Sequence, residues 1–242
     1  MSARGGGTNA IRKWIGVILK WAVASAMAPL VWTMARGLAL MLSGDAPALS
    51  PRLAAFLQGA GLYLLVHIPF WKPKPIYLLG HRMLQKLFVM ILGGHVSTIP
   101  QGATGQGSEV AAKPAAGGSK EQLLAAVSPA LIPIYTLLLT LGLGIWRSSG
   151  QVSLNDHWVA LGVGASTAFH LLMAIETIQE TREQQTVEGY VLTLEFIALA
   201  AVVVTVLCLA FLLPDLSVGQ CFQQAFHETL AIYTAVLHQL FF

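Results

Sequence analysis

Charged residues are scarce in this chain, in which Asp, Glu, Lys and Arg make up 10% of 242 residues against about 25% in an ordinary soluble domain. Cysteine is scarce too: Cys208 and Cys221 are the two present, so neither a disulfide framework nor a cysteine metal cluster is indicated. A basic stripe interleaved with aromatic residues is also missing, and we expect no nucleic-acid partner. These shortages argue against a soluble domain.

Apolar residues, in contrast, are abundant and make up 55% of the chain. Several apolar stretches reach the ~18 to 25 residues that cross a hydrocarbon core of about 30 Å. The sequence therefore predicts an all-α integral membrane protein, a bundle of about six transmembrane helices plus a C-terminal amphipathic helix. The expected spans are residues 14–42, 53–70, 76–94, 122–146, 157–178 and 189–213.

This pattern divides the chain into a basic N-terminal tail (1–13), a polytopic membrane domain (14–213) and the amphipathic C-terminal helix (214–242). Within the membrane domain, residues 95–121 are rich in Gly, Ala and Ser and contain no aromatic residue. Such a segment buries too little apolar surface to offset its ordering entropy, and we expect a mobile loop.

The N-terminus superficially resembles a signal peptide, with Ala24-Ser25-Ala26 as a cleavage site. The apolar run continues past that site to Leu42, which indicates a signal anchor instead. By the positive-inside rule, the basic N-terminus and the pair Lys72 and Lys74 are both expected to face the cytoplasm.

The C-terminal segment alternates apolar and polar residues at helical spacing. Its apolar side comprises Phe222, Phe226, Ile232, Tyr233, Val236, Leu237 and Leu240, opposite Gln223, Gln224, His227, Glu228 and His238. We expect an interfacial helix that lies on the membrane or docks on a neighbouring subunit. The absence of Lys and Arg from 217–242 favours docking on protein over binding to anionic lipid.

A short motif, Gly80-His81-Arg82-Met83-Leu84-Gln85 followed by Gly93-Gly94-His95-Val96, resembles the site-2-type zinc intramembrane metalloproteases. That family carries Gly-His-Glu-x-x-His on a membrane helix, where two histidines on one face hold zinc and the glutamate activates water. The segments Ser128 to Tyr135, His170 to Leu172 and Gln184 to Tyr190 resemble a bacterial branch of the family, so the likeness covers roughly 59–213. It implies a bacterial inner (cytoplasmic) membrane.

The resemblance places His81 at the first ligand position, Arg82 at the catalytic glutamate and Gln85 at the second histidine. A cation beside the metal and an amide in place of imidazole leave too few ligands for zinc. His227-Glu228 begins a similar motif, but Ala231 stands at its fifth position. The resemblance thus implies a degenerate site without catalysis and without a cofactor.

Arg82 on an apolar helix costs about 2.5 to 3.5 kcal/mol on insertion unless it is paired. A buried ion pair with Glu195 or Glu176 is the expected compensation, and it would fix helix registry. His170 and His67 are candidate axial ligands for a haem iron or a chlorophyll magnesium, although an interhelical hydrogen bond is the commoner use of such histidines.

These features predict a structural or accessory subunit that packs within a larger membrane complex, for example a photosynthetic or respiratory one. Its partners would be the lipid bilayer and other membrane-protein subunits. Two alternatives stay open: a membrane metalloprotease with a non-standard site, and a small transporter in which Arg82, Lys86 and Glu195 line a polar path. The side on which the tail lies depends on whether 76–94 crosses fully.

Overall fold

The structure, a computed structural model, describes residues 6–44, 50–67, 75–80, 82–83, 131–149, 155–180 and 186–241. These residues form helices and short connections, with no strand among them. The helices are α1 (Gly6–Ser43), α2 (Pro51–His67), α5 (Ile134–Ser148), α6 (Asp156–Glu180), α7 (Val187–Leu212) and α8 (Val218–Phe241). Residues 75–80 and 82–83 are helical as well.

Three helices are long and apolar enough to cross a membrane: Trp14–Ser43 of α1, Asp156–Gln179 of α6 and Val187–Leu212 of α7. By length and composition they support the predicted membrane class. Six crossings are not shown, because the other predicted spans are shorter or lie largely outside the described residues.

Two of the other expected spans are seen only in part. The described part of the span expected over 53–70 is α2, which ends at His67, and residues 68–70 lie outside the described residues. Within the span expected over 122–146, α5 begins at Ile134 after Pro133 at its N-cap, Leu131 is helical as well, and residues 122–130 lie outside the described residues. At 17 and 15 residues, these helices are below the ~18 needed for a crossing. The predicted loop 95–121 lies outside the described residues.

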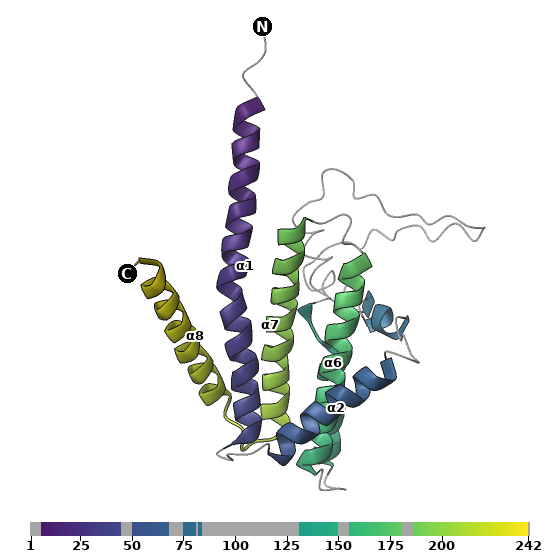
Figure 1. Cartoon of the computed structure of the whole chain (residues 1–242). Coiled ribbons are helices and arrows are strands. Elements are labelled where there is room, and N and C mark those ends of the chain that lie inside the picture. The colour runs from purple at the N-terminus through teal and green to yellow at the C-terminus, as the bar shows by residue number, and fades with distance from the viewer. Residues whose placement is uncertain are drawn as a thin grey trace, which may run out of the picture.

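α1 stands between α7 and α8 (Figure 1). α1 and α7 run in the same direction, while α6 and α8 run in the opposite one (Figure 1). α2 crosses the face of α6 and makes its most extensive packing there. At 38 residues, α1 is about 57 Å long, and its first turns extend beyond the start of α7. It begins within the segment expected to be a tail, since residues 6–13 are already helical.

Two apolar clusters hold the bundle together. The larger one joins α1, α6 and α7 to the start of α8 around Leu42, Val163 and Leu209. The second packs Tyr77, from the helical segment 75–80, against Met173 and other residues of α6 and α7. The two clusters lie at different heights along α6, so this helix packs against neighbours over much of its length.

Glycine permits the close crossing of α2 and α6. A Cβ atom at Gly59 would lie 1.9 Å from the backbone oxygen of Leu161, and one at Gly164 would lie 2.1 Å from that of Phe56. No side chain fits at either position. Small residues let helix backbones approach closely at these two glycines, whereas a Cβ at Gly61 or Gly142 would meet nothing within 4 Å.

Candidate functional site

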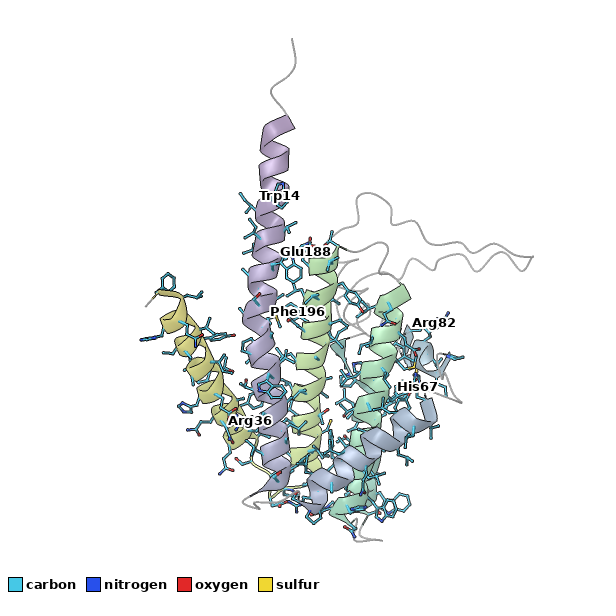
Figure 2. All side chains as sticks on the ribbon, in the orientation of Figure 1. Trp14, Arg36, His67, Arg82, Glu188 and Phe196 are labelled. Carbon is cyan, nitrogen blue, oxygen red and sulfur yellow. The ribbon has the colours of Figure 1, made fainter. Side chains whose placement is uncertain are left out.

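The degenerate protease motif is only partly visible. His81 and Gln85 lie outside the described residues, so their geometry and the likeness to a zinc site stay untested. Arg82 is described, and its side chain is exposed. It lines a shallow pocket of about 330 Å³ with Leu78 and Leu79. Figure 2 shows Arg82 on the side of the bundle where His67 also lies.

Arg82 forms no ion pair with Glu176 or Glu195 within the described part of the chain. Glu176 contacts His67 instead. Glu195 lies on α7, where its Oε2 atom is buried without a hydrogen-bond partner among the residues that the structure describes. The structure therefore does not bring together the residues expected to form the buried pair.

His67 lies at the centre of a hydrogen-bonded chain. Its Nδ1 is 3.0 Å from the Tyr63 hydroxyl, and its Nε2 is 3.0 Å from Oε1 of Glu176. In the tautomer protonated at Nε2, the histidine donates to Glu176 and the tyrosine hydroxyl donates to the histidine. Because both ring nitrogens are engaged, His67 offers no lone pair to a haem or chlorophyll metal in this arrangement.

The surroundings of this chain are aromatic. Phe169 of α6 meets Tyr63, Tyr77 and Tyr135 edge to face, with ring centroids 5.6, 6.2 and 5.0 Å away. His170 is 1% exposed, and its ring lies 6.3 Å from that of Tyr77. The second candidate cofactor ligand is thus packed among side chains of the core.

Sequence reasoning did not find the Tyr63–His67–Glu176 chain. The four-residue spacing of Tyr63 and His67 puts both on one face of α2, which was a usable signal. The glutamate comes from α6, 109 positions away in sequence from His67, and only the crossing of the two helices selects it.

A second polar cluster occupies one end of the bundle. Arg52, near the start of α2, donates from Nε and a terminal nitrogen to Oδ2 of Asp156, at 3.1 and 2.5 Å. Its other terminal nitrogen donates to Oδ2 of Asp215, at 2.5 Å. One guanidinium thereby joins α2, the start of α6 and the turn between α7 and α8.

Arg52 and Asp215 both lie outside the three candidate spans, and their contact shifts the pKa values of both side chains. The hydrogen bond from Arg52 lowers the pKa of Asp215, and the same bond raises the pKa of Arg52. Both effects favour the ionised forms. The cluster thus joins one arginine with two aspartates.

The helices at this end begin with side-chain caps. The Ser50 hydroxyl accepts from the backbone N–H of Leu53 at 3.2 Å, and Oδ1 of Asn155 accepts from that of His157 at 3.0 Å. α1 ends at Ser43, and the next residue, Gly44, has a positive φ of 58°, a backbone conformation that glycine adopts without strain. These caps fix the ends of α1, α2 and α6 around the Arg52 cluster.

The opposite end of the bundle carries another charged contact. Nζ of Lys20 on α1 is 3.8 Å from Oε1 of Glu188 and 3.5 Å from Oγ1 of Thr186, both at the start of α7. Figure 2 shows Glu188 beside α1, with Trp14 further toward the N-terminus. From Lys20 to Ser43, α1 rises about 35 Å, which matches a hydrocarbon core of about 30 Å with part of its headgroup layers.

α8 packs on α1 within this interval. The hydroxyls of Thr33 and Thr229 are 2.6 Å apart, and Arg36 pairs with Glu228 at 3.2 Å. The Tyr233 hydroxyl donates to the backbone oxygen of α1 at position 26. The predicted C-terminal helix is thus present, and it runs back along α1 (Figure 1).

The outward surface of α8 carries two exposed stripes. The polar stripe consists of Gln223, His227, Thr234 and His238. The apolar stripe consists of Phe222, Phe226, Leu230, Leu237 and Leu240, which are 37 to 71% exposed.

The described residues include no group of three or more His, Cys, Asp or Glu side chains arranged to hold a metal ion. No family model, no curated protein and no solved structure matches the chain. The likeness to site-2-type metalloproteases remains a prediction from the motif.

Proposed function

We propose that this chain is a non-catalytic, multi-pass membrane protein that serves as an accessory subunit of a larger membrane complex. The observation that carries the proposal is the placement of α8. Its contacts with α1 fall between positions 26 and 37, inside the interval bounded by Lys20 and Ser43. α8 therefore lies at the depth of the apolar helices rather than beyond their ends.

At that depth the polar stripe faces away from α1. Gln223 and His227 are exposed there, and hydrocarbon offers their side chains no hydrogen-bond partner, whereas the Thr234 hydroxyl already donates to the backbone oxygen of Leu230. A protein surface with polar groups would satisfy them. If α8 instead lay in water, the apolar stripe with Phe226 and Leu240 would be exposed to solvent. In lipid the polar stripe is unfavourable, and in water the apolar one is, so a partner surface is expected in either environment.

The long helix α1 adds a second surface. Only 6% of its most apolar window is buried inside the chain. Trp14, Ile15, Ile18 and Leu19 are each at least 60% exposed, next to the turns that extend beyond α7. Such a surface is covered either by lipid or by the transmembrane helices of a partner.

We also propose how the chain is arranged in the membrane. We propose six membrane-inserted segments, of which 76–94 does not cross fully and α2 and α5 are shorter ones, in a bacterial inner membrane with the N-terminus in the cytoplasm. Three crossings then precede Ser149, which agrees with the contact of Arg147 with Leu212 at the end of α7. The basic N-terminal segment and Lys20 lie at the same end of α1, as the positive-inside rule requires of a cytoplasmic end. Reporter fusions at Met1 and after Ser149 test the orientation: the first should report cytoplasm and the second the opposite side.

The subunit proposal is tested by extracting the tagged protein from its native membrane in mild detergent and identifying stoichiometric partners by mass spectrometry. The test variant replaces Gln223, His227 and Thr234 with leucine. Leucine suits both helix and lipid, so α8 should stay folded while the partner is lost from the particle.

The control variant carries Phe222→Leu, Phe226→Leu and Leu237→Met, which alters the apolar stripe to the same extent but keeps its character. It should retain the partner. A particle that contains this chain alone in the wild type would contradict the proposal. So would full retention of the partner by the leucine variant.

A further inference from the structure

An open cavity of about 940 Å³ lies at the Arg52 end of the bundle. The ends of α1, α2 and α6 and the turn leading into α8 enclose it. Its volume is within the range of about 300 to 1,000 Å³ that is usual for small-ligand sites. Neither the degenerate motif nor the contacts of α8 with α1 account for it.

The lining of the cavity includes both charged and apolar side chains. Arg52, Asp156 and Asp215 are the charged ones, and Leu40, Met41 and Leu216 are among the apolar ones. The cavity lies where the spans α6 and α7 meet the bundle end, at the depth of lipid headgroups if these helices cross the bilayer. A molecule with a polar end and an apolar remainder fits this lining.

Arg52 has N–H donors that the two aspartates do not use. A guanidinium has five N–H donors, and the two aspartates take three of those of Arg52. The remaining donors, on its terminal nitrogens, match the geometry of phosphate oxygens. The side chains of Asp156 and Asp215 are 39% and 57% exposed, so their carboxylates remain open to a cation.

The formal charge of the cluster selects among phospholipids. One arginine and two aspartates sum to −1, which disfavours a headgroup that carries phosphate alone. A headgroup with both phosphate and ammonium offers a partner to each sign of charge. A primary ammonium also donates hydrogen bonds to the carboxylates, which a trimethylammonium does not.

We propose that this cavity binds the headgroup of a zwitterionic phospholipid and prefers phosphatidylethanolamine. The phosphate would accept from Arg52, the ammonium would donate to Asp156 and Asp215, and the lipid chain would start along Leu40 and Met41. The inference requires only that the chain lies in a bilayer, and it is independent of any partner subunit.

The test is native mass spectrometry of the full chain in mild detergent. The protein is titrated separately with phosphatidylethanolamine, phosphatidylcholine and phosphatidylglycerol of equal acyl chains, and with soluble phosphoethanolamine. We expect phosphatidylethanolamine to bind best. Asp215→Asn, which removes one carboxylate at nearly constant shape, should lower that preference about three- to tenfold.

Two further variants separate a binding role from a structural one. Ser148→Lys changes the net charge by the same amount as Asp215→Asn, at an exposed position outside the cavity, and should leave the preference unchanged. Asp215→Glu keeps the charge and should retain the preference. Circular dichroism and melting confirm that each variant is folded.

Equal binding of the three lipids by the wild type would overturn the proposal, as would an unchanged preference in folded Asp215→Asn. If soluble phosphoethanolamine binds as tightly as the lipid, the ligand is a free small molecule and the lipid assignment fails. Weak binding of the soluble compound beside tight binding of the lipid supports it.

Discussion

The hydroxyl groups of Thr33 and Thr229 lie 2.6 Å apart, buried where α1 meets α8. Each hydroxyl also lies within hydrogen-bond distance of a carbonyl oxygen of its own helix, at positions 30 and 225, so one of the two protons is shared between the other hydroxyl and a carbonyl. The pair is the most enclosed polar contact between these helices. Its integrity reports directly on whether α8 is docked.

Replacement of Thr229 by valine should weaken the docking of α8, because the Thr33 hydroxyl loses a buried partner. The expected loss is about 1 kcal/mol. Thermal unfolding in detergent measures it. The double variant Thr33→Val with Thr229→Val should lose less than the two single variants combined, and strict additivity would contradict a direct coupling.

Alanine at Gly59 or Gly164 should destabilise the crossing of α2 and α6, because the added methyl group would meet backbone atoms at about 2 Å. Overpacking of this kind costs about 1 to 3 kcal/mol. Gly61→Ala is the matched control on α2, since its Cβ meets nothing within 4 Å. It should be neutral or slightly stabilising in the same melting experiment.

Glu176→Gln should lower the melting temperature more than Arg82→Leu does. Glu176 bonds the buried His67, whereas Arg82 is exposed and forms no ion pair among the described residues. Glutamine keeps a neutral acceptor for His67 but loses the charge, and because hydrogen bonds to charged groups are about twice as strong as neutral ones, we expect a loss of about 1 kcal/mol. A larger loss from Arg82→Leu would instead support the buried pair that the sequence suggested.

Stability should fall at acidic pH in part through Asp215. The hydrogen bond from Arg52 lowers the pKa of Asp215 in the folded state, so the ionised carboxylate stabilises the fold above its unfolded-state pKa. This contribution is lost as the pH falls through the folded-state value. Because the side chain is 57% exposed, we expect less than about 1 kcal/mol.

The comparison is between the wild type and Asp215→Asn, melted at a series of pH values from neutral to acidic. The two curves should differ at neutral pH and converge at low pH, where the aspartate is protonated. A constant offset at all pH values would show that the asparagine acts through packing rather than through charge.

Apolar length predicted much of the fold. Long runs without prolines, such as the one that ends at Leu212, gave spans with nearly the expected bounds. Pro133 interrupts another, at the N-cap of α5, whereas Pro29 lies inside α1, so the presence of a proline alone does not tell from the sequence where a helix stops.

The sites were harder to predict, because they depend on pairings between helices. Arg52 meets Asp156 and Asp215 across 104 and 163 sequence positions. Apolar helices provide little pattern from which to choose their neighbours. The motif at Arg82 resembles that of a known family, whereas Tyr63 and Arg52 belong to no such motif.

The joint between α1 and α8 connects the first described helix with the last. During synthesis, α1 enters the membrane early, and the face that carries Thr33 and Arg36 waits until every intervening helix has been made. Thr229 and Glu228 are then supplied at the end. Docking of α8 thereby depends on every helix between it and α1 having been made first, and a chain that stops before α8 leaves Thr33 and Arg36 without these partners.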